Sequence, residues 1–467
     1  MVPGVGSSTN RRYAVASLVR AMNINPYLQK VPSRGVLLGL SHASRLPRSS
    51  GVIIVTLPPK GRLVANDRRY PIAVVGDNFH GLLTSTTTRL RGLVSIVDIA
   101  PTALGRLHGG LGSVRSHHPV VVLERLDRQV HANNRLKMPT LIIIAVALAL
   151  LACFRPRLAL PAVLAALLTS LAAGALGIAN ETVLVAVMVI GMLFGGWTIA
   201  SATRSDGRLL AAITAVLALF YALLVLRPAW VAIAPLGPTQ NSRFWGIGNQ
   251  LETLLLAPLI AGSALAARRH GVIGFAAFAI FGLVLITDNR LGSDGGGAAV
   301  FGVALAIAGA RTLGLGRRGL VTLLLTNATL ALGIISLNLR LPGPNHLRSV
   351  FSHGLGGVAT VFANRVPLAY APALHQQLPV LVPLAAFFLV VLVLSLRASR
   401  GRTRDLVTAA VCALVTSLLL NDSAVYVLAG GTAVLAALAR FNVPPPTVAL
   451  ARSRQVALAP APLPSDE

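Results

Sequence analysis

Charged residues and cysteines are scarce in this sequence. Charged residues make up 12% of its 467 positions and hydrophobic residues 54%, which is too apolar for an ordinary soluble protein. The two cysteines, Cys153 and Cys412, both fall in apolar runs. Their placement excludes a disulfide framework and a Cys-X-X-Cys metal site.

Acidic residues and lysines are also few. The chain has 14 Asp and Glu against 41 Lys and Arg, and its only lysines are Lys30, Lys60 and Lys137, so arginine carries nearly all of the net charge of +27. In a soluble chain such a charge would indicate nucleic-acid binding. Here most basic residues lie in short loops between apolar runs, where membrane topology explains them better. We therefore expect no nucleic-acid partner.

Apolar blocks of membrane-spanning length begin at Pro139. Eleven spans are predicted, at 139–154, 158–178, 182–200, 209–226, 251–267, 271–287, 297–312, 319–337, 378–396, 406–420 and 423–440. Several are short for a hydrocarbon core about 30 Å thick, so two of them could merge or re-enter the membrane. The sequence predicts a mainly α-helical polytopic membrane domain over residues 139–440, in contact with the lipid bilayer.

Residues 1–138 form a separate unit. Short apolar runs at 35–40, 52–56, 72–75 and 120–123 alternate with polar segments, which predicts a small, incomplete α/β domain with buried strands. Asp98 is a candidate N-cap for a short helix with Pro101 in its first turn. The basic segment 108–134 is expected to end in a linker.

Two further segments have recognisable composition. Residues 346–365 place apolar residues at near-helical spacing with basic residues between them, which predicts an amphipathic helix in the membrane interface. The tail at 441–467 is rich in Pro and Ala and is predicted to be disordered.

The loops between the spans fall alternately into two sets. The first set and the tail carry Arg155, Arg157, Arg204, Arg208, Arg268, Arg269, Arg311, Arg317, Arg318, Arg397, Arg400, Arg402, Arg404, Arg440, Arg452 and Arg454. The second set carries Glu181, Glu252, Asp288, Asp294 and Asp422. The positive-inside rule places the first set and the carboxy terminus in the cytoplasm, and the amino-terminal unit outside the cell membrane. Arg135 and Lys137, just before the first span, argue weakly for the opposite orientation.

An external amino-terminal unit requires a signal peptide or an earlier membrane helix. Residues 1–25 offer neither an apolar core nor a cleavage site. Either the topology is inverted or the chain begins inside a longer natural protein, and we favour the second explanation.

Three polar segments of the second set interrupt the apolar runs. They contribute Asn241, Arg243, Trp245, Asn249, Glu252, Asp288, Asn289, Arg290, Asp294, Asn421 and Asp422. Ionisable groups in or beside a bilayer are costly and usually face a cavity, a partner or a ligand. We therefore predict that these residues line one polar pocket that opens outward. The alternative is a set of independent loops whose charges pair locally.

The residue types of this predicted pocket suit an anionic ligand. Arginine recognises phosphate or carboxylate through paired hydrogen bonds. Asp and Glu beside it bind divalent cations or act as bases. Phe244 and Trp245 fit an interfacial anchor or a stacking surface for a lipid or a sugar.

Two resemblances add to these inferences. Gly81-Leu-Leu-Thr-Ser-Thr-Thr-Thr-Arg-Leu-Arg-Gly-Leu-Val-Ser-Ile-Val-Asp-Ile-Ala-Pro-Thr102 resembles the carboxy-terminal part of alkaline-phosphatase-like domains. The segments NSRFWGIGNQLE, DNRLGSDGGG and NDS resemble a family of uncharacterised bacterial multi-pass membrane proteins that carry such a domain before their helices. Together the resemblances span most of residues 35–440.

The first resemblance implies metal-dependent phosphoryl transfer, with a Ser or Thr nucleophile between two metals held by Asp and His. This chain departs from that pattern, because the part that would bear the nucleophile is not visible and the adjacent Asp-His pair is replaced by Gly76-Asp-Asn-Phe-His80. Asp77 and His80 remain weak candidates for one divalent metal ion. His117 and His118 fit a solvated pair better than a metal site.

Two functional hypotheses follow. In the first, the protein binds or processes a phosphorylated lipid or cell-envelope precursor at the outer face of the membrane. In the second, it is an ion-coupled transporter that uses carboxylates such as Glu252 and Asp288. The sequence shows no clear internal repeat and an odd number of spans, so we favour the first.

Overall fold

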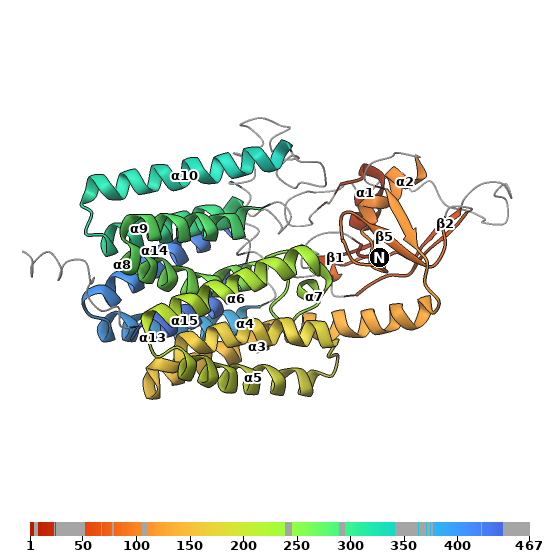
Figure 1. The fold of residues 1–467 in the computed structure, drawn as a ribbon. Helices are drawn as coiled ribbons and strands as arrows, with labels where there is room; N and C mark the ends of the chain where they lie inside the picture. Colours follow the sequence, from red (N-terminus) through yellow and green to blue (C-terminus); the bar gives the residue numbers. More distant parts are fainter. Residues whose placement is uncertain are drawn as a thin grey trace, which may run out of the picture.

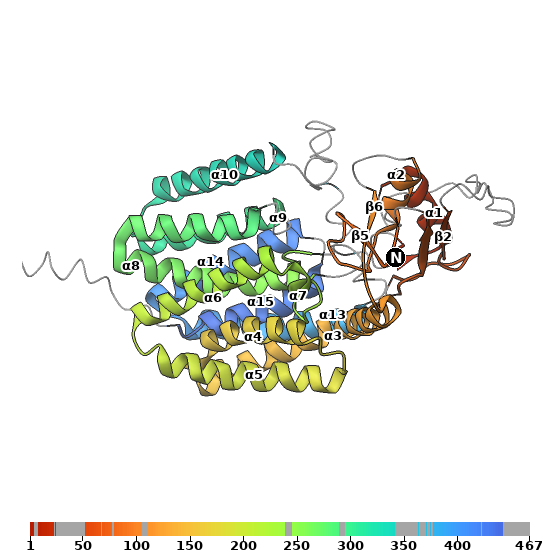
Figure 2. The same cartoon turned by 45° about the vertical axis from the view of Figure 1, so that its right-hand side comes forward.

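The computed structural model shows a bundle of long helices with a small unit of short strands at one end (Figures 1 and 2). It describes residues 1–3, 8–22, 24, 52–66, 68–76, 79–104, 110–238, 245–288, 295–340, 363, 370, 374, 377–421 and 423–441. The predicted tail and almost all of the predicted interfacial helix at 346–365 lie outside these residues.

The bundle is built from apolar helices that run side by side. They are α3 (Pro119–Phe154), α4 (Pro156–Leu176), α5 (Glu181–Ala202), α6 (Asp206–Leu226), the short α7 (Pro228–Ala232), α8 (Asn249–Thr287), α9 (Gly295–Thr312), α10 (Arg317–Arg340), α13 (Leu378–Ala398), α14 (Gly401–Leu420) and α15 (Ala424–Leu438). Within the described part of the chain, eight of them are long and apolar enough to cross a membrane, and the apolar stretches of α9 and α15 are shorter. The chain is a mainly helical, multi-pass membrane protein.

Helix α8 folds back on itself at Gly271, whose backbone is non-helical at φ 61° and ψ −146°. A Cβ atom at Gly262 would overlap the ring of Phe278, and one at Gly282 would press on Leu259. The two arms therefore pack antiparallel, and glycine allows their close approach. The sequence predicted these arms as two separate segments, at 251–267 and 271–287.

The amino-terminal unit contains three short antiparallel strand pairs. β1 (Ser8–Thr9) pairs with β3 (Val64–Ala65), β2 (Val52–Val55) with β4 (Ile72–Val75), and β5 (Leu82–Ser85) with β6 (Leu111–Val114). The helical elements of the unit are α1 (Arg11–Arg20), the 3-10 turn η2 (Ile96–Asp98) and α2 (Ile99–Ala103). Its small apolar core includes Ala14, Val94, Ile96 and Ile99.

Several details of this unit differ from the prediction. The strands at 52–55 and 72–75 are present but half-buried rather than buried: Ile54 is exposed in the first, and Ala73 and Val75 are exposed in the second. The apolar run at 120–123 lies in α3 and is not a strand. α3 begins at Pro119, where proline suits the first turn, and continues without a break through the predicted linker and the predicted boundary at residue 138. The run at 35–40 lies outside the described residues.

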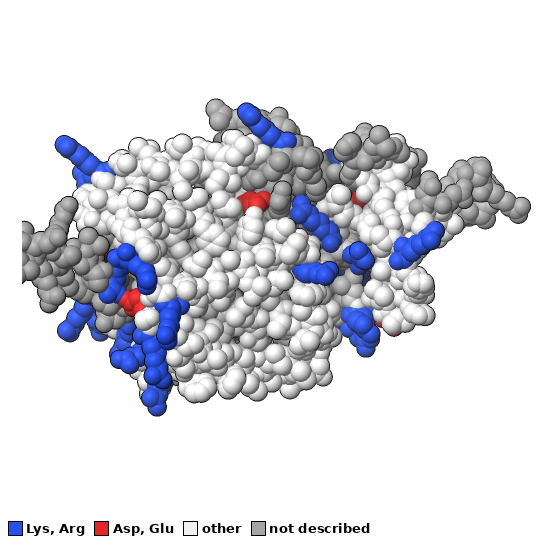
Figure 3. Space-filling model, in the orientation of Figure 1, with Lys and Arg blue, Asp and Glu red and all other residues white. Residues whose placement is uncertain are grey.

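Figure 3 shows Lys and Arg side chains at both ends of the molecule and none on the middle of this flank of the bundle. At the end away from the amino-terminal unit, Arg268, near the fold of α8, pairs with Asp206 at the start of α6. At the same end, Nε of Arg311 on α9 lies 3.9 Å from Oδ1 of Asp405 on α14. The helices thus sort the connections into two sets at opposite ends.

Candidate functional site

Glu252 stands at the start of α8, at the end of the bundle that faces the amino-terminal unit. Its side chain is buried, with 1% of the residue exposed. Its Oε1 atom accepts a hydrogen bond of 3.1 Å from Nδ2 of Asn421, which ends α14. The same Nδ2 donates to Oγ of Ser417 at 2.7 Å. The contact joins two helix ends that are 169 residues apart in sequence.

The glycine run at the start of α9 brings a third helix end to this carboxylate. A Cβ atom at Gly297 would lie 3.0 Å from the carboxyl carbon of Glu252 and 2.9 Å from Cγ2 of Ile286. Any larger side chain would push α9 away from the carboxylate. This explains, in part, why glycines follow a polar segment here.

Asp288 ends α8 and lies at the same end of the bundle. Its Oδ2 atom accepts a hydrogen bond of 2.9 Å from the hydroxyl of Tyr221 on α6. Nothing in the sequence singles out Tyr221, because aromatic residues such as Phe220 and Tyr221 are ordinary in the apolar run of a membrane helix.

The amino-terminal unit reaches this end of the bundle through Trp245. Nε1 of Trp245 donates to the backbone oxygen of Thr87 at 3.0 Å. Cζ of Arg89 lies 3.4 Å from the centroid of the Trp245 ring, a cation–π contact. Burial lowers the pKa of Arg89, and the carboxylate of Asp288 opposes that shift. Arg89 therefore lies against the tryptophan ring and interacts electrostatically with the carboxylate of Asp288.

Arg89 belongs to a rigid loop of the unit. It has φ 56°, in the left-handed region that is uncommon for residues other than glycine. The neighbouring Thr87 donates its hydroxyl to Oδ1 of Asp98 at 2.6 Å, and the backbone N–H of Ser95 donates to Oδ2 at 3.1 Å. Burial raises the pKa of Asp98, while hydrogen bonds from Thr87, Ser85 and Ser95 act in the opposite direction.

The role of Asp98 differs from the predicted one. It precedes α2 as expected, and Pro101 lies within that helix, but the Asp98 side chain makes no capping hydrogen bond to α2. It instead reaches back to Ser95 in a capping box of the preceding turn. Asp98 thus holds the threonine-rich loop that carries Arg89.

Two basic residues that argued for the opposite topology have structural partners. Lys137 is buried in the bundle, where Nζ donates to the backbone oxygen of Pro238 and, at 3.2 Å, to Oδ1 of Asn134. Arg135 forms an ion pair of 3.2 Å with Glu181. Neither is an isolated loop charge, so both carry less weight in assigning an orientation.

Of the predicted site residues, the structure brings some together and leaves others undescribed. Glu252 accepts a hydrogen bond from Asn421. Arg89 lies against the ring of Trp245 and interacts electrostatically with Asp288. Asn249 begins α8, and its backbone oxygen accepts a hydrogen bond of 2.7 Å from the hydroxyl of Thr253. Outside the described residues lie Asn241, Arg243, Asn289, Arg290, Asp294 and Asp422. Arg89, Thr87, Tyr221 and Ser417 are the site neighbours that the sequence-based prediction lacked.

A metal site is not supported by the side chains that the structure describes. Within that part of the chain, no three His, Cys, Asp or Glu residues come close enough to hold an ion. His80 is exposed, and its backbone N–H donates to Oγ of Ser113 at 3.1 Å. Asp77 lies outside the described residues, and the exposed His117 and His118 directly precede α3.

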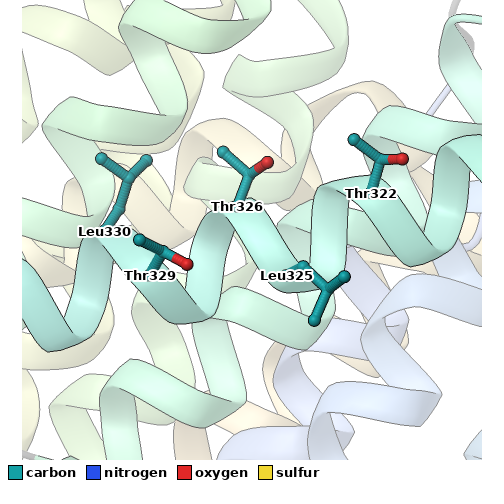
Figure 4. A pocket seen from close by; sticks show the side chains of 5 residues that line it. All are labelled: Thr322, Leu325, Thr326, Thr329 and Leu330. Atoms are coloured by element: carbon teal, nitrogen blue, oxygen red, sulfur yellow. The ribbon is translucent and has the colours of Figure 1, made fainter.

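A shallow hollow of about 350 Å³ on α10 differs from this site in its chemistry. It is lined by Thr322, Leu325, Thr326, Thr329 and Leu330, all on one helix (Figure 4). Oγ1 of Thr322 already donates to the backbone oxygen of Arg318 at 3.0 Å. No ionisable group lines the hollow, so it offers no acid, base or charge for a ligand.

No protein-family model, curated protein or solved structure matches this chain. The candidate site therefore rests on its own residues and geometry.

Proposed function

We propose that this membrane protein binds or processes a phosphorylated lipid or cell-envelope precursor at the end of the bundle beneath the amino-terminal unit. The observation that carries the proposal is the convergence of Glu252, Asn421 and Gly297 beside a second group made by Asp288, Tyr221, Arg89 and Trp245. These residues come from α6, α8, α9 and α14, from the segment just before α8, and from the amino-terminal unit.

The location of the carboxylates supports a functional role. Carboxylates within a membrane bundle are expensive, and they persist where they serve a ligand, an ion or a proton. A purely structural contact between α8 and α14 could be made by apolar residues at lower cost. Glu252 and Asp288 also lie next to the segments that carry Arg243 and Arg290, which supply suitable charge for a phosphate group.

The proposal also includes the number of membrane crossings, the orientation of the chain and the nature of the amino-terminal unit. The two arms of α8, together with the shorter α9 and α15, would raise the number of membrane crossings to eleven. The arginine-rich end would face the cytoplasm and the amino-terminal unit the outside. The amino-terminal unit would resemble alkaline-phosphatase-like domains.

Binding of an isoprenyl monophosphate to the full chain in phosphatidylcholine nanodiscs tests the proposal. The double substitution Arg243→Ala/Arg290→Ala should weaken binding about tenfold or more, because each arginine supplies charged hydrogen bonds to phosphate. Arg317→Ala/Arg318→Ala at the opposite end removes the same charge and should leave the affinity unchanged. Equal affinities for both double variants and the unchanged chain would reject the proposal.

Ion-coupled transport remains the second candidate, and the buried carboxylate of Glu252 is the observation that favours it. In proteoliposomes, Glu252→Gln keeps the shape of the side chain and removes its charge. A transporter that couples through Glu252 would lose its ion-dependent flux in this variant. A flux that is the same in the variant and the unchanged chain would remove this candidate.

A further inference from the structure

A pocket of about 470 Å³, separate from the hollow on α10, lies where α3, the end of α4 and α7 meet. Arg125, Arg128 and Gln129 of α3 form one wall, and Trp230 of α7 forms another. Gly174 and Leu176 lie at the end of α4. The described residues that line this pocket include two arginines and no carboxylate.

The two arginines offer their charge on one face of α3. Residues three apart on a helix are neighbours, so Arg125 and Arg128 project to the same side. Both are exposed, and neither forms an ion pair with a residue that the structure describes. The Nε atom of Arg128 makes a long hydrogen bond of 3.4 Å to the backbone oxygen of Glu124. Most of their N–H groups therefore stay available to an anion.

The residues around this pocket are of the types expected where lipid tails meet lipid headgroups. Leu176 and Leu226 end α4 and α6 and are 76% and 71% exposed. Trp230 is 37% exposed, and Cζ of Arg227 lies 5.7 Å from its ring centroid. Exposed leucines, an amphipathic tryptophan and arginines in this succession are typical of the boundary between lipid tails and headgroups.

The carboxyl-terminal end of α4 would by itself disfavour an anion, because helix carbonyl groups there carry partial negative charge. Two of these carbonyl groups, however, already accept hydrogen bonds. The backbone oxygen of Gly174 accepts from Nε2 of Gln129 at 3.2 Å and from the N–H of Gly177 at 3.3 Å. The oxygen of Ala173 accepts from the N–H of Ile178 at 3.2 Å. The two arginine charges then dominate the pocket.

We propose that this pocket binds the phosphate of an anionic glycerophospholipid from the surrounding bilayer leaflet. Arg125 and Arg128 would hold the phosphate, and Trp230 would lie against the glycerol region. The apolar rim favours a lipid over a free phosphate, because acyl chains can lie along Leu176 as the headgroup enters. No residue that lines this pocket belongs to the proposed functional site, although Ile233, which lines the pocket, packs in one cluster with Trp245.

Native mass spectrometry of the full chain with phosphatidylglycerol and phosphatidylcholine tests this proposal. The unchanged chain should retain phosphatidylglycerol in preference to phosphatidylcholine. Arg125→Gln/Arg128→Gln should lower the affinity for phosphatidylglycerol about tenfold or more, because it removes two charged hydrogen-bond donors. Arg91→Gln/Arg115→Gln removes two exposed charges from the amino-terminal unit and should retain the preference.

Two further measurements complete this experiment. Trp230→Leu should weaken binding only severalfold, since it leaves both arginines in place. Soluble glycerol phosphate should not displace the lipid, and displacement would show a free-phosphate site instead. Equal retention of both lipids by the unchanged chain, or an undiminished preference in Arg125→Gln/Arg128→Gln, would overturn the proposal. All these variants leave Arg89, Glu252 and Asp288 intact, so failure here is distinct from failure of the proposed function.

Discussion

The two ends of the helix bundle handle their acidic residues in different ways. At the end away from the amino-terminal unit, Asp206 and Asp405 lie beside arginines of neighbouring helices, Arg268 and Arg311. At the other end, Glu181 also pairs with an arginine, Arg135, but Glu252 accepts from an amide and Asp288 accepts from a phenol. The ion pairs join neighbouring helices, and those that are largely exposed contribute little to stability.

Glu252 and Asp288 each accept a hydrogen bond from an uncharged donor, and Asp288 also has a charged neighbour, Arg89. Asn421 and Tyr221 could satisfy their hydrogen-bonding groups with neutral acceptors. A carboxylate at these positions therefore indicates a requirement beyond packing. Among the described residues, the amino-terminal unit contacts this end through Arg89 and Trp245. The difference between the two ends is the basis for the proposed ligand or ion chemistry at this end.

Removing one carboxylate from each end of the bundle tests the difference between the two ends most strongly. Glu252→Ala should lower the free energy of unfolding by about 1–3 kcal/mol, because it leaves the buried amide of Asn421 without this acceptor. Asp405→Ala should cost about 0–1 kcal/mol, since its pair with Arg311 is long and exposed. Unfolding in mixed micelles measures both, and equal losses would contradict the distinction.

A second test adds one methyl group beside Glu252. Gly297→Ala should cost about 1–3 kcal/mol, because its Cβ would press on Ile286 and on the carboxyl group. Gly333→Ala on α10 is the matched control, since no atom lies within 4 Å of a Cβ there. The control should be as stable as the unchanged chain or slightly more stable. Equal stability of both variants would mean that α9 does not approach Glu252 closely.

The contact between the amino-terminal unit and the bundle depends on Trp245. Trp245→Ala removes the hydrogen bond to Thr87 and the ring beneath Arg89, together worth about 1–3 kcal/mol. Amide hydrogen exchange at residues 82–104 should become faster. Trp197→Ala, at an exposed position on α5, should leave that exchange unchanged. Similar rates in both variants would show that the unit is held elsewhere.

The smallest expected effect concerns pH and Asp98. Because burial raises the pKa of Asp98, the folded loop binds a proton more tightly than the unfolded chain. The stability of this loop should therefore be highest in acid and should fall as the pH rises from the ordinary value of 3.8 through the raised pKa. Asp98→Asn should flatten this dependence in hydrogen exchange of residues 82–104, after correction for the intrinsic rate. A dependence of the opposite sign would contradict the buried environment.

The helices could be predicted because their signal is local. Each predicted span falls in a helix of the structure, including the two arms of α8, whose separation at Gly271 follows from a glycine between apolar runs. The boundary at residue 138 could not be placed, because nothing in the polar first half of α3 distinguishes a helix that extends beyond the membrane from a linker. The charged residues in the first half of α3 suit a helix or a linker equally well, and only the packing of neighbouring elements decides between the two.

The sequence predicted the two carboxylates of the candidate site and one of their partners, Asn421, but not the other partners. Glu252, Asp288 and Asn421 stand out as polar residues beside apolar runs. Tyr221, Ser417 and Arg89 do not, because their importance comes from contacts between segments far apart in the chain. Lys137 illustrates the same limit, since a basic residue before a span resembles a loop charge until its contact with Pro238 is seen.

The orientation of the carboxylate-bearing end tests the central claim most directly. In a chain with Cys153 and Cys412 replaced by alanine, single cysteines can be placed at His117, Ala179 and Leu315. A membrane-impermeant thiol reagent added to intact cells should label the first two positions, which lie at the end near the amino-terminal unit, and should leave position 315 unlabelled. Labelling at position 315 with protection of the other two would contradict the account, because the proposed site would then face the cytoplasm.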